Sequence, residues 1–220
     1  VHMQMVWDAY QKSNCPPLGI FNFNDMQRLL RGSILPDVPY VGENLWGYLD
    51  FDWSIMDTFN FVMDSIAFWQ NHFGSLGYRH GMGGSGTPNQ MRDNIVNGIL
   101  SDVNAFRDNG NYLKLGAALH TLGDTFAPSH TARNEKGEIS QYQDFNAQDS
   151  SEHKRGDRIQ GNEPFYNDAT KTLIDFLNLV CNEACTEEDL MDYLKNGPLK
   201  HDPNVLVGGS VYEYKSKTER

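Results

Sequence analysis

Positive charge is scarce in this chain. The 220 residues include 18 Lys and Arg against 29 Asp and Glu, so the formal net charge is −11. Proteins bind a nucleic-acid duplex largely by neutralising its phosphates, and this charge argues against duplex nucleic acid as a partner. A metal-centred site for a phosphate ester is not excluded, because bound cations can dominate the local field.

Long apolar runs and cysteines are also few. No uncharged apolar run approaches the roughly 18 residues that a membrane span needs, and no signal peptide is visible. The three cysteines, Cys15, Cys181 and Cys185, cannot all pair within the chain. Cys181 and Cys185 are near enough to bridge around a helix end, but two buried thiols explain them at least as well. The redox compartment stays open.

The apolar spacing predicts an all-α fold, a multi-helix bundle with long loops. Hydrophobic residues make up 39% and aromatic residues 12%, enough for a substantial core. We expect one domain over 1–220, with a wrapping segment over 1–50, a helical core over 51–196 and a tail over 197–220. Helices are expected over 24–31, 52–73, 89–107, 111–127, 149–159, 164–181 and 187–196.

The remaining segments are expected to be irregular. The first three residues resemble a cloning remnant, and the rest of 1–50 is rich in Pro, Gly, Asn and aromatic residues, which predicts extended chain and turns around one short helix. The polar segment over 132–148 is expected to be a loop. Gly208 and Gly209, flanked by apolar residues, predict a small C-terminal hairpin.

The motif that carries most chemical information lies in the helix expected over 111–127. His120 and Asp124 are four residues apart and therefore project from one helical face, beside Gly116 and Gly123. An imidazole and a carboxylate one turn apart can bind a single cation, and the glycines let a metal or a second helix approach closely. His130 follows just after the break at Pro128, where the chain can turn it toward the same cavity.

A second stretch repeats this pattern. His153 and Asp157 are again four residues apart, with a glycine before the aspartate, and form a second His–carboxylate pair suited to a metal. One such pair alone is more simply explained as an ion pair or a hydrogen-bonded core histidine. Two pairs together with His130 and His80, in a glycine-rich loop, favour a metal site. His2 and His201 fall outside this scheme.

These residues resemble the zinc-dependent phospholipase C and single-strand-specific nuclease superfamily. The resemblance covers roughly residues 50–180 and is strongest over 119–130. It implies a mainly helical fold and a cluster of two or three zinc ions that hydrolyses phosphodiesters. His120 and Asp124 would serve the paired metals, with Asp124 bridging, while His130, His153 and Asp157 would hold another zinc. The Asp at 157 is similar to the nuclease form, since the phospholipases more often carry Glu there.

Upstream, the resemblance also implies an Asp and a His. His80 and His72 compete for the histidine, and we slightly prefer His80 because its glycine neighbours permit close approach. Asp57 leads among the acids, as the group that orients or deprotonates the attacking water. Arg79 is a candidate phosphate contact, although a surface charge explains it equally well. The family completes its third metal with an N-terminal Trp and a nearby His. Here Val1 stands first, Trp7 lies inside the chain and only His2 is close, so the choice between a two-metal and a rearranged site is left open.

We therefore expect a metal-dependent phosphoric diester hydrolase of phospholipase C type. The expected substrate is a phospholipid head group or another phosphodiester, with transient contact to a membrane surface. The alternatives are a single-strand nuclease of the same superfamily and a non-catalytic, zinc-stabilised module or effector domain of a larger secreted protein. The expected location is secreted or periplasmic, or that of a delivered effector. Neither the oligomeric state nor the choice between lipid and nucleic acid follows from these residues.

Overall fold

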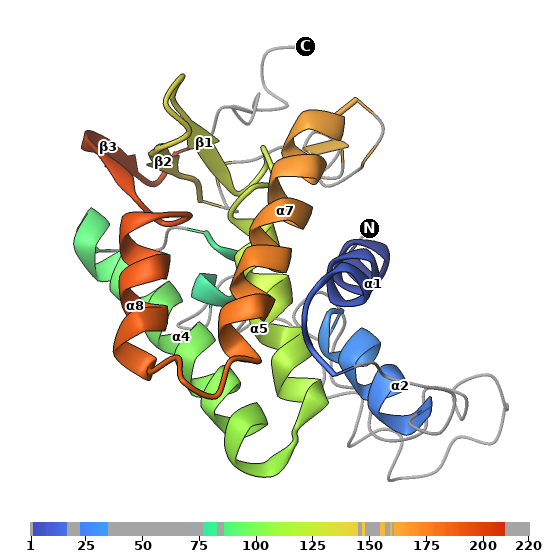
Figure 1. Ribbon diagram of the computed structural model, residues 1–220. Coiled ribbons are helices and arrows are strands. Elements are labelled where there is room, and N and C mark those ends of the chain that lie inside the picture. The colour runs from blue at the N-terminus through green and yellow to red at the C-terminus, as the bar shows by residue number, and fades with distance from the viewer. Residues whose placement is uncertain are drawn as a thin grey trace, which may run out of the picture.

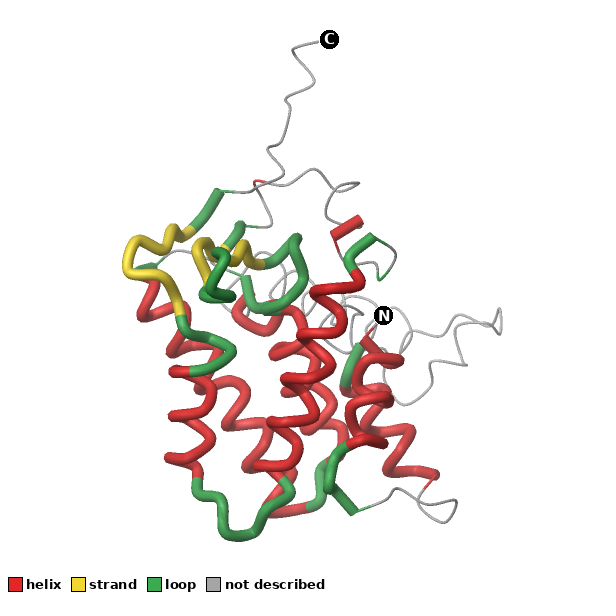
Figure 2. The backbone as a smooth tube through the Cα atoms, turned by 45° about the horizontal axis from the view of Figure 1, so that its top comes forward, coloured by secondary structure: helices red, strands yellow, loops and turns green. Residues whose placement is uncertain are grey.

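The protein is largely helical, with a small sheet at one end of the helices (Figures 1 and 2). The computed structural model describes residues 2–16, 23–34, 77–82, 86–144, 147, 155–156, 159 and 161–209. The helices are α1 (His2–Lys12), α2 (Phe23–Gly32), the short 3-10 helix η3 (Gly77–His80), α4 (Pro88–Asn109), α5 (Tyr112–Asp124), α7 (Glu163–Val180) and α8 (Glu187–Asn196). The strands are β1 (Thr131–Arg133), β2 (Ile139–Tyr142) and β3 (His201–Val207). A mostly helical chain was predicted and is confirmed.

The central element is α5, which contacts α1, α2, α4, α7 and η3. Every residue of α5 from Leu115 to Asp124 is buried, so this helix has no solvent-exposed face over its last ten residues. The sequence predicts an apolar stripe of Leu115, Leu119, Leu122 and Phe126; the three leucines are fully buried in the core, and Phe126, beyond the end of the helix, is 9% exposed. Polar groups at the end of such a helix are held among packed neighbours, which is why the chemistry of α5 depends on what surrounds it.

The helix ends follow local capping rules. Thr87 and Gln90 form a capping box at the start of α4, and Gly110 ends that helix in the left-handed conformation. Thr186 and Asp189 form a capping box at the start of α8. The helices expected over 24–31, 89–107, 164–181 and 187–196 are confirmed within two residues at each end. By contrast, α5 ends three residues before the predicted end, because Thr125 begins a run of tight turns that leads to His130.

Residues 2–12 form the helix α1, so the expectation of extended chain for the first residues is wrong. In α1, Met5, Val6, Ala9 and Tyr10 are buried at helical spacing, and the helix packs mainly on α7. A disulfide joins Cys15, just beyond α1, to Cys181 at the end of α7. The suggested Cys181–Cys185 bridge is therefore wrong, and Cys185 is a buried free thiol.

The predicted loop over 132–148 contains two strands instead. The strands β1 and β2 pair antiparallel and are joined by a turn. The side chain of Asn134 closes this turn, because its Oδ1 accepts hydrogen bonds from the backbone N–H groups of Lys136 and Glu138. The third strand, β3, pairs in parallel with β2, so the sheet order is β1-β2-β3. The predicted C-terminal hairpin needs a second strand after Gly209, and those residues lie outside the described part of the chain. In the described part, β3 pairs with β2.

Two expected helices fall largely outside the described residues. These are the helix over 52–73 and the helix over 149–159, which carry Asp57, His72, His153 and Asp157. None of the helices that the structure does describe is both long enough and apolar enough to cross a membrane.

Candidate metal centre

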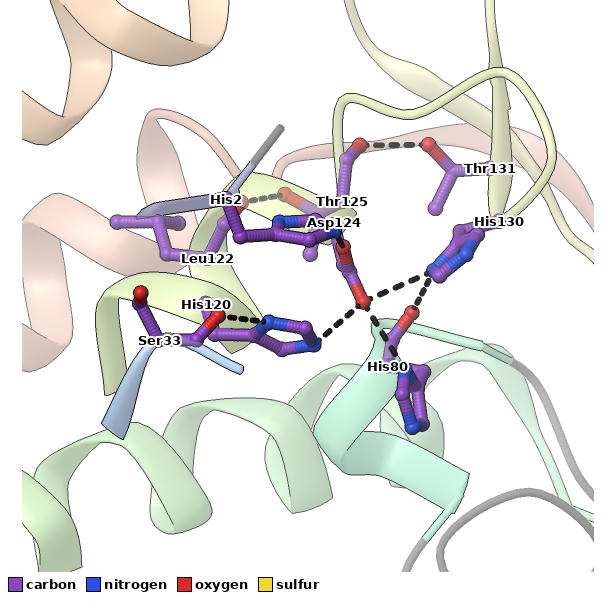
Figure 3. A network of polar contacts seen from close by, with 9 residues as sticks. All are labelled: His2, Ser33, His80, His120, Leu122, Asp124, Thr125, His130 and Thr131. Atoms are coloured by element: carbon purple, nitrogen blue, oxygen red, sulfur yellow. Dashed lines mark hydrogen bonds and ion pairs between the residues drawn. The ribbon is translucent and has the colours of Figure 1, made fainter. Parts of the chain in front are cut away.

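Four histidine side chains converge on one carboxylate, that of Asp124 at the end of α5 (Figure 3). Its Oδ2 atom lies 3.0 Å from Nε2 of His120, 3.1 Å from Nδ1 of His80 and 3.2 Å from Nδ1 of His130. Its Oδ1 atom lies 3.3 Å from Nε2 of His2. The five side chains come from α1, η3, α5 and the turns after α5, so the cluster forms only when these elements pack together.

The charge of Asp124 is set by this surrounding. Asp124 is fully buried, which opposes ionisation and would raise its pKa. The imidazoles of His120, His130 and His2 outweigh that effect and hold the pKa of the carboxyl well below its usual range. The centre is therefore an ionised carboxylate enclosed by imidazoles, which is a donor set typical of a divalent transition metal.

The ring of His120 is oriented by a backbone carbonyl. Its Nδ1 lies 2.8 Å from the carbonyl oxygen of Ser33, which can only accept, so Nδ1 carries the proton. In the neutral ring, Nε2 then directs its lone pair at Asp124 Oδ2. Two lone-pair atoms 3.0 Å apart repel unless a proton or a cation lies between them. A carbonyl that fixes the tautomer of a histidine in this way is a common arrangement behind metal ligands.

Close packing of two helices brings the Ser33 carbonyl to His120. Gly116 lies one turn before His120 on the same face of α5, and a Cβ atom there would lie 2.1 Å from the carbonyl oxygen of Leu29. Gly32 makes the matching approach from α2, with its own Cβ position 2.0 Å from the carbonyl oxygen of Leu113. The prediction that small residues beside His120 admit a second helix is confirmed.

His80 is held at the cluster by a turn that requires glycine. Gly81 has a φ of 61°, and a Cβ atom there would lie 2.8 Å from Cγ2 of Thr125. The 3-10 helix η3 is thereby pressed against the end of α5. The carbonyl of His80 also accepts a hydrogen bond from Nδ1 of His130, so the two histidines orient each other.

The chain between Asp124 and His130 is fixed by the small sheet. The carbonyl of Thr125 accepts hydrogen bonds from Oγ1 of Thr131 at 2.6 Å and from Nη2 of Arg133 at 2.8 Å. The Arg133 guanidinium also lies over the ring of Phe126, 4.1 Å from its centroid, and donates to the carbonyl of Pro198. Burial lowers the pKa of Arg133 to about 10. These contacts anchor the turns that direct His130 back toward Asp124.

His2 was placed outside the metal scheme by sequence reasoning, and the structure corrects this. It lies at the start of α1, three, four and seven residues before the buried Met5, Val6 and Ala9, and therefore on the same helical face. Its ring centroid is 4.3 Å from that of His120. The helical spacing of these apolar residues was the signal that could have identified it, had the first residues been given weight.

The spacing of the cluster suits metal ions. The described residues form two groups able to hold a cation, His2–His120–Asp124 and His80–Asp124–His130, which share the carboxylate. Ligand atoms about 2.0 Å from a tetrahedral zinc ion are separated from each other by about 3.3 Å. The distances to Asp124 from His120, His80 and His2, 3.0–3.3 Å, are close to that value, whereas the contact from His130 is made by Nδ1, which donates to the His80 carbonyl. Hydrogen bonds also fall in this range, and a proton on Nε2 of His120 would join it to Asp124 as a cation would, so the geometry permits a metal ion without requiring one.

Comparison with protein-family models, curated proteins and solved structures finds no match to this chain. The functional argument therefore rests on the site itself.

The other predicted site residues are not part of the described cluster. Arg79 precedes His80 in η3, and no hydrogen bond or ion pair joins it to the cluster among the described residues. Asp57, His72, His153 and Asp157 lie outside those residues, so their positions relative to Asp124 are not described. Of the sequence-predicted ligands, the structure brings together His80, His120, Asp124 and His130.

Proposed function

We propose that the protein is a zinc-dependent phosphodiester hydrolase of phospholipase C-like type, which uses a multinuclear metal site to activate water. The observation that carries this proposal is the buried carboxylate of Asp124, which two groups of imidazoles share: His120, His80 and His130 approach its Oδ2 atom and His2 its Oδ1 atom. A carboxylate that bridges two nearby cations is the arrangement by which paired metals act on one phosphate ester. The motif around His120, Asp124 and His130 supports the same class.

The donor chemistry favours zinc over the hard divalent cations. Imidazole nitrogens suit zinc, copper and nickel, whereas calcium and magnesium prefer all-oxygen sites. His2, His120 and Asp124 would hold one ion, and His80, His130 and Asp124 another. This proposal moves His130 out of the expected group with His153 and Asp157, which stay proposed ligands of a further ion. When bound, zinc supplies a nucleophile from water at neutral pH and neutralises charge on the phosphoryl oxygens.

The protein's own groups prepare this chemistry. The carbonyls of Ser33 and His80 fix the protonated nitrogens of His120 and His130, which directs the other ring nitrogen of each toward a ligand position. Asp57 is proposed to orient the attacking water and accept its proton, and Arg79 to contact the phosphate. Both roles rest on the sequence motif.

The disulfide supports an oxidising location. Disulfide bonds form and persist mainly in secreted and periplasmic proteins, and the Cys15–Cys181 bond fits that setting. We therefore keep the proposal of a secreted, periplasmic or delivered protein that acts on phospholipid head groups at a membrane surface. Single-stranded nucleic acid is the alternative phosphodiester.

A non-catalytic zinc module is the second candidate, and burial of the cluster favours it. His120 and Asp124 are 0% exposed and His80 and His130 are 3% exposed, which is typical of closed structural metal sites. His2 is the exception among the five, because 13% of its side chain is exposed. Coordination distinguishes the candidates, since a structural site is closed and four-coordinate whereas a catalytic site keeps an open position.

The test measures zinc content and hydrolysis together. Zinc-loaded protein is assayed against bis-p-nitrophenyl phosphate, phosphatidylcholine and single-stranded DNA, with bound metal determined by mass spectrometry. Asp124→Asn should lose both zinc and activity. Asp102→Asn is the matched control, because Asp102 is also a buried helical aspartate but pairs with Lys114 at 2.8 Å.

The outcomes separate the candidates. Full zinc and activity in Asp124→Asn would show that the proposed centre is wrong. Bound zinc without hydrolysis of any of the three substrates would favour the structural module. The preferred substrate among the three identifies the enzyme as phospholipase or nuclease.

A further inference from the structure

A pocket lies beside the metal centre, between α1, α7 and the turns after α5. Counted out to open solvent at its mouth it measures about 360 Å³, but the part in which a water-sized molecule can be centred is about 40 Å³. His2 and Met5 of α1 form one wall, Phe126 lies in the turns, and Phe165 and Tyr166 come from the first turn of α7. Of these residues, only His2 is also a proposed metal ligand.

The pocket connects the buried cluster to solvent. His2 contacts Asp124 on one side and lines the pocket on the other, and Gly123, the neighbour of Asp124, lines it too. His2 is also the most exposed of the five cluster residues. Among the described residues, a molecule that reaches the cluster past His2 must therefore place part of itself in this pocket.

The walls of the pocket are apolar and uncharged. No Lys, Arg, Asp or Glu occurs among the described residues that line it. The hydroxyl of Tyr166 donates to Oδ2 of Asp8 at 3.2 Å, and the amide of Asn162 donates to the carbonyl of Arg155 at 2.9 Å. The third polar side chain of the lining, His2, contacts Asp124, so all three already have protein partners. Phe165, which is 40% exposed, extends the apolar surface to the mouth.

We propose that this pocket binds part of an acyl chain of the phospholipid whose phosphate lies at the metal centre. The proposal rests on the function proposed above and adds to it a site for the lipid chain. At about 10–15 Å³ of enclosed space per water-sized group, the pocket holds about three groups, so it takes only the first carbons of a chain, and the rest would lie along the mouth. An acyl chain needs no hydrogen bonds, which matches walls whose polar groups are already used.

A nucleobase is the less suitable occupant. Its ring edge carries several hydrogen-bond donors and acceptors, and these would lose water without gaining partners against apolar walls. Among the described residues, the lining also offers no basic side chain for the neighbouring phosphates of a polynucleotide. The phospholipid is therefore the occupant that the pocket favours.

The test measures binding of ethyl, butyl, hexyl and octyl phosphate by calorimetry, to zinc-loaded and metal-free protein. Affinity should rise by about fourfold per methylene until the pocket is filled. Ala169→Leu, which adds bulk to a buried lining position on α7, should reduce this gain per methylene. Phe165→Ala removes exposed wall at the mouth and should reduce it as well, at an exposed position where misfolding is not expected. Leu206→Ala is the control, because Leu206 is 62% exposed on β3 and does not line the pocket.

Several results would overturn the proposal. Equal affinity for ethyl and octyl phosphate would do so, as would a chain-length gain that survives both Ala169→Leu and Phe165→Ala. Tighter binding of a nucleoside monophosphate than of octyl phosphate would assign the pocket to a base. The alkyl phosphates are monoesters, so their binding is measured without any phosphodiester hydrolysis. If affinity rises with chain length but the protein has no phosphodiesterase activity, the proposed function is refuted and the assignment of the pocket to an alkyl chain stands.

Discussion

Replacement of Gly116 by alanine tests whether the contact between α2 and α5 positions the metal centre. The new Cβ atom would lie 2.1 Å from the carbonyl oxygen of Leu29 and 2.8 Å from the backbone nitrogen of Ser33. An ordinary contact begins at 3.4 Å, so α2 must retreat by about 1.3 Å. Both clashing groups are backbone, and neither can rotate away. The retreat would carry the Ser33 carbonyl away from Nδ1 of His120.

Two opposing effects set the size of the change. Alanine is favoured over glycine within a helix by about 1 kcal/mol. Overpacking a close contact costs about 1–3 kcal/mol, and the rigid neighbours here place Gly116 at the upper end of that range. We therefore expect Gly116→Ala to lower the free energy of unfolding by about 2 kcal/mol, which corresponds to a fall in Tm of about 4–8 °C for a chain of this length.

Gly123→Ala is the matched control within the same helix. Its Cβ atom would meet Cε of Met5 at 2.3 Å, but that atom is the far end of a flexible side chain. The helix-propensity gain is the same at both positions, so a difference between the variants reports the rigidity of what the new methyl group meets. We expect Gly123→Ala to change stability by less than about 1 kcal/mol.

Thermal unfolding of the metal-free proteins measures the change in stability, and zinc titration of the folded proteins measures the change in zinc affinity. Loss of the carbonyl behind His120 should weaken zinc binding by about 10–100-fold in Gly116→Ala. A Gly116→Ala protein at least as stable as the parent, with unchanged zinc affinity, would refute the reasoning. It would mean that α2 does not position His120.

Three further substitutions test the fold. Cys15→Ser should lower the free energy of unfolding by about 2–5 kcal/mol in urea titrations, whereas the same change at the free thiol Cys185 should cost less; equal effects would argue against the disulfide. Arg133→Met removes the guanidinium donor from the Pro198 carbonyl and leaves Thr131 as the side-chain donor to the Thr125 carbonyl, so it should cost about 2 kcal/mol by the same measurement, and an unchanged midpoint would contradict the anchoring role. Thr186→Ala should cost about 1 kcal/mol. Since hydrogen bonds from the Thr186 backbone and side chain hold the pKa of Asp189 below its usual value, NMR titration should show that pKa rise part of the way; no rise would exclude the capping box.

Features of the fold that depend on a few neighbouring residues were predictable. The capping box at Thr186 and the facing pair His120 and Asp124 follow from spacings of three and four residues in a helix. The position of Gly116 one turn before His120 likewise indicated a close helix contact. In each case the physical cause lies within about one helical turn.

Features that depend on distant segments were not predictable. Cys15 pairs with a residue 166 positions away, and this requires α1 to dock on α7. The same docking brings His2 to Asp124. The strand β3 pairs with β2 across most of the last third of the chain, although its sequence near Gly208 suggests a local hairpin. Such contacts are decided by packing of whole elements, which spacing alone does not reveal.

The Cys15–Cys181 bond also decides what a protease can do to this protein. It closes the chain into a covalent ring from residue 15 to residue 181, a ring that contains His80, His120, Asp124 and His130. A single cut anywhere in that ring opens it without releasing a fragment, so α1 and α7 stay attached. A nicked molecule would therefore run as one species on a gel until it is reduced and then separate into two.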